Sequence, residues 1–217
     1  MNNLIIQKYL EKPSLINGRK YDIRFFMFIA CTKPYLVMTN SGYIRVALED
    51  YNLETFGTGD KKDKTTHLTN ASVQKGHPKF KELKEQTIMS MKQLGEYLVQ
   101  NKPDIVPTVQ DFETKVVDKI AEICRLIFET VKNKLERKFG CFELFGFDFM
   151  LDEDLNPVLV EANTNPALFT DTAFQKEMLP KLVDDAVKLA LQLHPAGKTD
   201  GHEEVKSFLD NNLVESL

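Results

Sequence analysis

Polar and apolar residues alternate with a period of two over residues 20–25, ahead of an apolar run over residues 25–31. Within residues 21–31, Asp22 and Arg24 fall on the same side of a strand as Phe26, whereas the odd-numbered positions are apolar. This alternation is typical of strands whose two faces meet different surroundings. The predicted strands are residues 4–10, 21–31, 35–39 and 43–48, the last two joined as a hairpin around Asn40-Ser41-Gly42.

The second half of the chain changes to apolar residues three or four positions apart, which is the spacing of one helix face. One such stripe predicts a helix over residues 80–98, and a longer stripe predicts a helix over residues 112–135. A third helix is predicted over residues 174–193, and Pro195 ends it.

Two segments lack both periods. Residues 50–76 contain Gly57, Gly59 and many charges, so a long loop is predicted there. Residues 196–217 form a polar tail with room for one short amphipathic helix. A run of lysines is either a solvated loop or a contact for an acidic partner, and it comprises Lys61, Lys62, Lys64, Lys75, Lys79 and Lys81.

A second pair of strands lies within residues 147–163, joined by an acidic turn over residues 152–156. Strands therefore come first along the chain, then helices, then strands again. This order predicts an α+β fold, with a largely antiparallel sheet flanked by helices.

Composition is ordinary for a globular protein, with 42% hydrophobic and 28% charged residues among 217. The net charge of −4 argues against nucleic acid as a partner, because phosphate binding needs a basic surface. The longest apolar run, residues 25–31, is too short to span a bilayer, and the first residues do not resemble a signal peptide. The three cysteines form no CxxC pair, which favours a reducing compartment. We expect a cytoplasmic protein that binds neither nucleic acid nor membrane.

Three oxygen-bearing side chains in the hairpin are candidate metal ligands. Glu161 and Asn163 are two positions apart and share a face, and the turn brings Asp148 opposite them. Carboxylate and amide oxygens at this spacing suit Mg²⁺, which takes few protein ligands and keeps water and phosphate. The alternative is that these acidic residues are salt-bridge partners or solvated turn residues, and the pattern alone leaves both interpretations open.

Charged residues also interrupt the apolar strands of the first half. Asp22 and Arg24 share one face and could pair with each other, and Arg45 is a third charge among apolar neighbours. On one face of a sheet, these side chains and the metal ligands would form a polar floor with charges of both signs. Guanidinium groups beside Mg²⁺ match the charge of a transferring phosphoryl group.

Five motifs in this order resemble those of the tubulin–tyrosine ligase-like proteins of the ATP-grasp superfamily. They are Gln7-Lys8-Tyr9-Leu10, Gly18-Arg19-Lys20-Tyr21-Asp22-Ile23-Arg24, His67-Leu68-Thr69-Asn70, Phe145-Gly146-Phe147-Asp148-Phe149 and Glu161-Ala162-Asn163-Thr164-Asn165-Pro166. The resemblance covers residues 4–193 and is closest to the polyglycylase branch.

The resemblance implies a role for each matched residue. The implied ATP-binding residues are Gln7, Lys8, Tyr9 and Leu10 at the adenine hinge, Lys20 and Asp22, and Thr69, Asn70 and Ser72 where the nucleotide meets the incoming amino acid. The implied catalytic residues are Arg24 and Arg45, which hold the carboxylate substrate and its phosphorylated form. The implied Mg²⁺ ligands are Asp148, Glu161 and Asn163.

The implied reaction joins a free amino acid, with glycine favoured, to a carboxylate of an acidic tubulin tail or of another protein, through an acyl phosphate. Such an enzyme acts on the microtubule cytoskeleton or in cilia. Alternatives are glutamate as the amino acid, a small-molecule ligase of the same superfamily, or a non-catalytic module that binds nucleotide or tubulin.

The resemblance also predicts an incomplete enzyme. Residues 1–195 match part of a catalytic domain and residues 196–217 form a tail, while the N-terminal lobe with its Gly-rich phosphate-covering loop has no counterpart. A nucleotide site needs both walls to exclude water. We therefore expect weak ATP binding and slow turnover from this chain alone.

Overall fold

The computed structural model describes residues 5–57 and 61–212. Six strands within these residues form one sheet, in the order β4-β3-β2-β5-β6 with β1 beside β2, and every pair is antiparallel. The strands are β1 (Leu15–Ile16), β2 (Arg19–Thr32), β3 (Tyr35–Asp50), β4 (Ile88–Ser90), β5 (Glu143–Leu151) and β6 (Pro157–Asn163). The predicted α+β class with a largely antiparallel sheet is confirmed.

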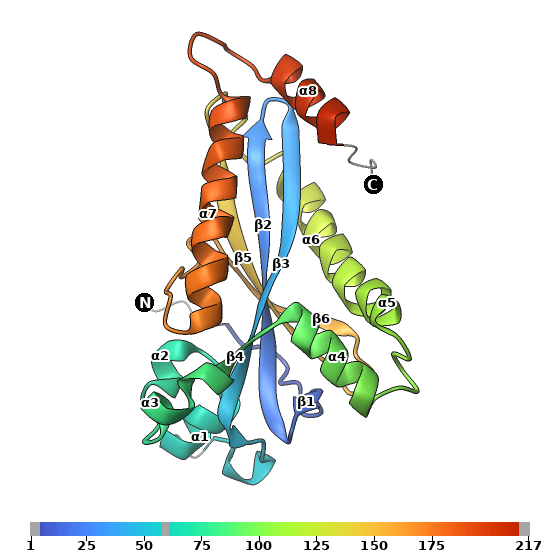
Figure 1. Cartoon of the computed structure of the whole chain (residues 1–217), viewed down its shortest axis with the longest axis vertical. Helices are drawn as coiled ribbons and strands as arrows, with labels where there is room; N and C mark the ends of the chain where they lie inside the picture. Colours follow the sequence, from blue (N-terminus) through green and yellow to red (C-terminus); the bar gives the residue numbers. More distant parts are fainter. Residues whose placement is uncertain (1–4, 58–60, 213–217) are drawn as a thin grey trace.

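The helices of the described residues divide into four groups. The first group is η1 (Leu53–Thr55), α1 (Lys61–His67), α2 (Ala71–Gln74), α3 (Phe80–Leu83) and η2 (Lys84–Thr87), and the second is α4 (Met91–Asn101), α5 (Val109–Phe112), the π-helical turn η3 (Glu113–Val117) and α6 (Asp118–Val131). The long helix α7 (Ala173–Leu193) and the short helix α8 (His202–Asn212) follow β6. In Figure 1, α7 runs along one side of the long β2–β3 pair, and α4 to α6 run along the other.

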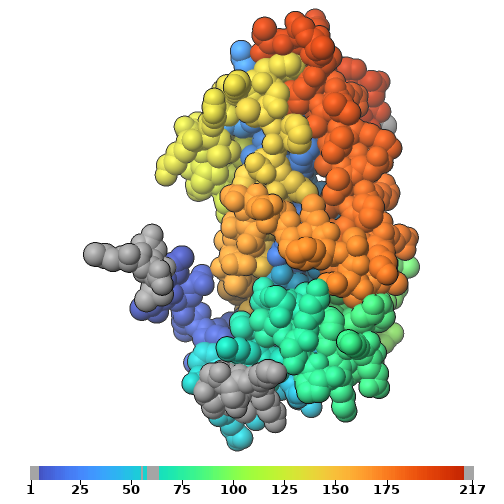
Figure 2. Space-filling model, turned by 90° about the vertical axis from the view of Figure 1, so that its left-hand side faces the viewer, coloured from blue at the N-terminus to red at the C-terminus, as the bar shows by residue number. Residues whose placement is uncertain are grey.

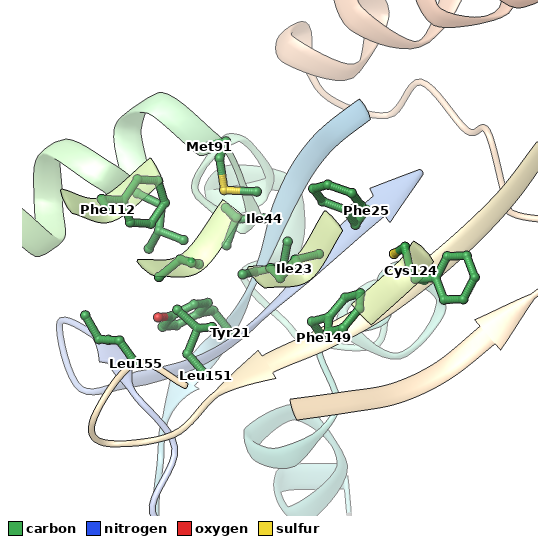
Figure 3. Packing of buried hydrophobic residues seen from close by; sticks show 14 of the residues in the cluster. Tyr21, Ile23, Phe25, Ile44, Met91, Phe112, Cys124, Phe149, Leu151 and Leu155 are labelled. Atoms are coloured by element: carbon green, nitrogen blue, oxygen red, sulfur yellow. The ribbon is translucent and has the colours of Figure 1, made fainter. Parts of the chain in front are cut away.

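The main core fills the space between the sheet and helices α4 to α6. Ile23 and Phe25 of β2 pack there with Phe149 of β5 and with Phe112 and Ile120 of the helices, and all five are almost fully buried. Figure 3 shows the labelled β2, β3 and β5 side chains converging from the sheet. Each such side chain contributes about 1.5–3 kcal/mol through removal of apolar surface from water. The odd-numbered face of β2 was therefore predicted correctly.

The even-numbered face of β2 changes character along its length. Phe26 and Phe28 lie in two smaller apolar clusters, which include Leu179, Ala190 and Leu193 of α7. Earlier in the strand, Lys20, Asp22 and Arg24 occupy the same face. Helix α7 therefore covers the apolar half of this face, and the polar half is bordered by other segments.

Residues 35–48 form one strand, so the predicted hairpin around Asn40-Ser41-Gly42 is wrong. The register against β2 slips between Arg24 and Phe26, which marks a bulge. Gly42 adopts φ +57°, and a Cβ there would lie 2.0 Å from the backbone oxygen of Arg24. The glycine thus permits a bulge where the sequence suggested a turn.

The stripe over residues 80–98 does not form one helix. It is divided among α3, η2, β4 and α4, because Ile88–Ser90 pairs with β3 and Ser90 then begins α4 through a capping box with Gln93. The stripe over residues 112–135 is helical as predicted up to Val131, and α7 confirms the helix predicted over residues 174–193.

Residues 50–76 were predicted to be a loop, yet they contain η1, α1 and α2. Thr65, Thr66 and His67 are buried, and Gln74 donates to the backbone oxygens of Thr65 and Leu68, so packing orders a segment without periodicity. Residues 58–60 and the side chains of Lys61 and Lys62 lie outside the described part.

The predicted strand over residues 4–10 is also wrong, because Ile5 to Leu10 pair with no described strand, and residue 4 lies outside the description. The short helix expected in the polar tail is present as α8, and residues 213–217 are not described. No helix within residues 5–57 and 61–212 has the length and hydropathy needed to cross a membrane.

Candidate functional site

A cavity of about 260 Å³ lies over the polar half of the sheet's α7 face. Its floor comes from β2, β3 and β6, and its walls come from the segment after α1 and from the loop between β6 and α7. Figure 2 shows these two walls meeting on one face of the molecule, the first in teal to green and the second in orange. The lining residues are Arg24, Tyr43, Arg45, Thr69, Asn70, Ala71, Ser72, Gln74, Thr87, Ile88, Glu161, Asn163, Asn165, Ala167, Phe169, Asp171 and Gln175.

Two buried arginines and two carboxylates form a continuous network beneath the cavity. Arg24 Nε lies 2.7 Å from Asp148 Oδ1, and Arg45 Nη2 lies 2.8 Å from Asp148 Oδ2. Arg45 also donates to both oxygens of Asp22, at 2.6 and 2.7 Å. Asp22 and Arg24 could have paired with each other, but each pairs across strands instead, because the register sets Arg24 against Asp148 and Asp22 against Arg45.

This network stabilises the charge of Arg45. Burial by itself lowers the pKa of Arg45, but attraction and hydrogen bonding from Asp22 and then from Asp148 outweigh burial and raise the pKa above its ordinary value. Bidentate contact with Asp22 also fixes the orientation of the guanidinium plane. Arg45 is thus a permanent, oriented cation at the cavity floor.

Arg24 has a donor without a partner. Its side chain is 6% exposed, and its Nη1 is buried and makes no hydrogen bond to any residue that the structure describes. A buried guanidinium nitrogen without an acceptor is costly. Because Arg24 also lines the cavity, a bound anion would satisfy this donor.

The three predicted metal ligands lie on one face of the β5–β6 hairpin. Asp148 is directly opposite Glu161, and Asn163 donates to Glu161 Oε1 at 3.1 Å. Glu161 and Asn163 line the cavity, whereas Asp148 is 3% exposed and both of its oxygens accept from arginine.

These donors fit a cation that needs few protein ligands. Glu161 and Asn163 supply accessible oxygens, and Asp148 Oδ1, which accepts from Arg24 Nε, has a second lone pair that no described residue is shown to use. Among the described residues, no group of three His, Cys, Asp or Glu side chains is arranged to hold a metal. A cation here would thus rely on an amide oxygen and on substrate oxygens as well as the carboxylates.

Lys20 lies farther along the polar half of β2, outside the cavity lining. It is buried, with Nζ donating to the backbone oxygen of His67 at 2.9 Å and to the Tyr9 hydroxyl at 3.1 Å. Burial lowers the pKa of Lys20 to about 8, against the attraction of Asp22. Nζ also lies 4.7 Å from the centroid of the Tyr9 ring. The face of this ring, the Tyr9 hydroxyl and the backbone oxygen of His67 therefore partly replace the water that would solvate the ammonium group.

The predicted hinge residues lie beside the sheet edge. Gln7 donates through Nε2 to the backbone oxygen of Val160 in β6 at 3.2 Å, while Lys8 is exposed and Leu10 is partly buried. The structure thus brings the hinge to β6, whereas Tyr9 lies with Lys20.

The three predicted residues near residue 70 differ in their roles. The Thr69 hydroxyl donates to Asp22 Oδ2 and so joins the buried network. Asn70 and Ser72 line the cavity with exposed side chains. All three lie on the wall that follows α1.

Sequence reasoning missed several cavity residues. Gln74 accepts from Leu48 N at 3.0 Å and is fully buried, but a single glutamine in a segment without periodicity carries no readable signal. Gln175 was more accessible to sequence reasoning, because Thr172-x-x-Gln175 before an apolar stripe is a capping box. Asp171 binds Lys75 at 2.8 Å across the two walls, a long-range contact that no local pattern encodes.

Comparison with known proteins gives one family and several relatives. The sequence model described as the tubulin-tyrosine ligase family matches residues 1–200. The protein polyglycylase TTLL10 of Rattus norvegicus is 37% identical over 87% of this chain and 27% of that protein. The inactive polyglycylase TTLL10 of Homo sapiens is 34% identical over 87% of this chain and 27% of that protein.

A more distant relative, the tubulin monoglutamylase TTLL4 of Homo sapiens, is 29% identical over 86% of this chain and 16% of that protein. The chain therefore spans about a quarter of the length of the polyglycylases that it matches.

Proposed function

The chain belongs to the tubulin-tyrosine ligase family, and on that premise we propose that it carries part of the active site of an ATP- and Mg²⁺-dependent ligase. The ligase joins the amine of an amino acid to a carboxylate of a protein acceptor. Tubulin, with its acidic tails, is the proposed acceptor, because two of the relatives are named as tubulin-modifying or polyglycylating proteins. The microtubule cytoskeleton of the cytoplasm or cilium is then the proposed site of action.

One observation carries this proposal: Arg24, whose buried Nη1 has no partner among the described residues, lines a cavity together with Arg45 and Glu161. Such a site has cationic donors for a carboxylate or phosphate and a carboxylate that could share a cation with it. Binding of an anion satisfies a donor that is otherwise buried and unmatched. Transfer of a phosphoryl group to a carboxylate uses such a combination, with cationic groups for the developing charge and a carboxylate for the metal ion.

The proposed reaction has two steps. An oxygen of the acceptor carboxylate attacks the γ-phosphorus of ATP, ADP leaves, and an acyl phosphate forms. The amine of the amino acid then attacks the acyl carbon, loses a proton and displaces inorganic phosphate, leaving an amide bond. Arg24 would bind the acceptor carboxylate, and Arg45 would stabilise charge on the phosphorylated form.

The nucleotide would be held by the adenine hinge at Gln7–Leu10, by Lys20, Asp22 and Thr69, and by the neighbouring Asn70 and Ser72. Asp148, Glu161 and Asn163 would hold Mg²⁺, which when bound neutralises phosphate charge. Asp148 would then share its carboxylate between the cation and two arginines. This sharing couples the metal site to the carboxylate site.

We further propose that the sheet is the C-terminal lobe of an ATP-grasp fold and that the second wall of the nucleotide site comes from a further lobe. Support comes from β6, the last strand of the described sheet, which exposes Val158, Leu159 and Val160 to between 37% and 40%. Ile5 and Ile6, in the segment that Gln7 joins to β6, are 87% and 98% exposed. Exposed apolar side chains on an edge strand are typical of a surface that another element covers.

Glycine is the proposed amino acid, and glutamate is the alternative, since relatives named for either amino acid match the chain. A non-catalytic module that binds nucleotide or tubulin is the second candidate, favoured by the match to a relative named inactive. Labelled glycine and glutamate, each supplied with ATP and tubulin, separate these candidates. Incorporation of glycine supports the first, incorporation of glutamate the alternative, and incorporation of neither favours the module.

The metal site is tested by titrating ATP into the chain with and without Mg²⁺. We expect weak binding that requires Mg²⁺ and is lost in the double variant Asp148→Ala and Glu161→Ala. The matched control, Glu153→Ala with Asp154→Ala, removes the same number of carboxylates from the exposed turn. Equal binding by the wild type and by the Asp148 and Glu161 variant would exclude this metal site.

A further inference from the structure

Gly146 lies under the guanidinium of Arg24. It is a buried residue of β5, two positions before Asp148 and therefore on the same face. A Cβ built at Gly146 would lie 3.0 Å from Arg24 Nη1 and 3.2 Å from its Cδ. It would also lie 2.7 Å from the Cβ of Pro166, a buried residue of the loop after β6. A side chain at Gly146 would thus meet both Arg24 and Pro166.

Arg24 is fixed from the other direction by Asp148. The register places Arg24 opposite Asp148, and its Nε and Nη2 both face that carboxylate, at 2.7 and 3.4 Å. Nη1 takes no part in this pairing and is the Arg24 nitrogen nearest to Gly146. The direction of Nη1 therefore depends on how closely the arginine lies against the β5 backbone.

We propose that Gly146 is a positioning residue, whose lack of a side chain lets Arg24 lie so that Nη1 is presented to the acceptor carboxylate. The proposal rests on the proposed function, because it concerns the carboxylate site of that reaction. Gly146 touches no substrate and acts only through Arg24. Its required property is the absence of a side chain.

The geometry indicates how much a methyl group would change. The contact of 2.7 Å with Pro166 is shorter than two carbon atoms tolerate, and the contacts of 3.0 and 3.2 Å require Arg24 to move by a few tenths of an ångström. A misplacement of about 1 Å in a reacting site can reduce the rate about 100-fold, so this smaller shift should reduce it by roughly 3- to 10-fold. We expect such a loss in Gly146→Ala, seen in kcat/KM for the protein acceptor because Arg24 binds the acceptor carboxylate.

The test needs a control for overpacking alone. In Gly95→Ala, the new Cβ would lie 2.7 Å from the ring of Phe112, in the core on the opposite face of the sheet. This variant reproduces the close contact without touching Arg24, so it should lose thermal stability and keep ligation activity. Gly146→Ala combined with Pro166→Gly removes the contact with the proline side chain and leaves the contacts with Arg24. A loss of activity in this combined variant is then not caused by misfolding from the clash with Pro166.

A double-mutant cycle with Arg24→Lys tests whether Gly146 acts through Arg24. Once the guanidinium is gone, adding Gly146→Ala should change ligation less than about 2-fold. A loss of similar size in both backgrounds would overturn the proposal, and so would near-wild-type activity of Gly146→Ala.

A second measurement works even where no ligation is detected. The Nε–H resonance of Arg24, assigned by its disappearance in Arg24→Lys, reports the hydrogen bond to Asp148. It should shift in Gly146→Ala and in the Pro166 combination but stay in place in Gly95→Ala. If the wild type does not ligate and the resonance still shifts, the proposed function fails while the positioning role stands. If the resonance does not move, the positioning role is wrong whatever the activity.

Discussion

Lys20→Met should alter the pH dependence of folding in a direction that follows from the burial of this lysine. Burial lowers the pKa of Lys20 in the folded protein to about 8 from its ordinary 10.5. Between these values the unfolded chain binds more protons at this site than the folded protein does. The folded wild type therefore carries a cost at neutral pH that declines as the pH rises.

The size of the effect follows from the same two pKa values. A shift from 10.5 to about 8 corresponds to about 3 kcal/mol at pH 7, and to about 1 kcal/mol at pH 10. The hydrogen bonds from Lys20 to Tyr9 and to His67 are lost in the variant at every pH, so they add a nearly constant amount. The difference in stability between wild type and variant should thus change by about 2 kcal/mol over this range, in favour of the wild type.

Urea denaturation at several pH values between 7 and 10 measures this difference. Other titrating groups contribute alike to both proteins and cancel. Lys119→Met, at an exposed position of α6, controls for removal of one lysine. A difference between wild type and Lys20→Met that stays constant with pH, or changes in the opposite direction, would refute the reasoning.

Three further predictions concern stability and partner binding. Asp22→Asn should lower the free energy of unfolding by about 3–5 kcal/mol, because it leaves the buried Arg45 without its bidentate partner. Urea denaturation measures this loss, and an unchanged denaturation midpoint would contradict a stabilising role of the buried charge network. Gly42→Ala should cost at least about 2 kcal/mol, since it combines positive φ with a Cβ at 2.0 Å from a backbone oxygen, and a melting temperature within 2 °C of the wild type would disprove the required bulge. Lys79→Glu with Lys81→Glu should weaken binding of a glutamate-rich peptide and reduce the salt dependence of that binding. Fluorescence anisotropy at two salt concentrations measures both quantities. An unchanged affinity would show that these exposed lysines are only solvated.

Helices and strands could be predicted from the sequence where the spacing of apolar residues followed one period without interruption. The alternation in β2 assigned Ile23 and Phe25 to one face, which the structure shows to be the core face, and the stripe of α7 was equally regular. Prediction failed where a tertiary partner determined the conformation. Ile88–Ser90 lies within a helical stripe but pairs with β3, because a hydrogen-bonded strand edge was available there. In contrast, the segment from Ile5 to Leu10 pairs with no described strand, although Gln7 lies against β6.

The sequence by itself determined which residues face the cavity side of the sheet. Strands fix side-chain direction every second residue, so Asp22, Arg24, Glu161 and Asn163 could be assigned to faces by counting. Only the tertiary structure decided which charges meet. Arg24 binds Asp148, which is 124 residues away, because the register between β2 and β5 places them opposite each other. Register depends on the packing of whole strands, and no local pattern records it.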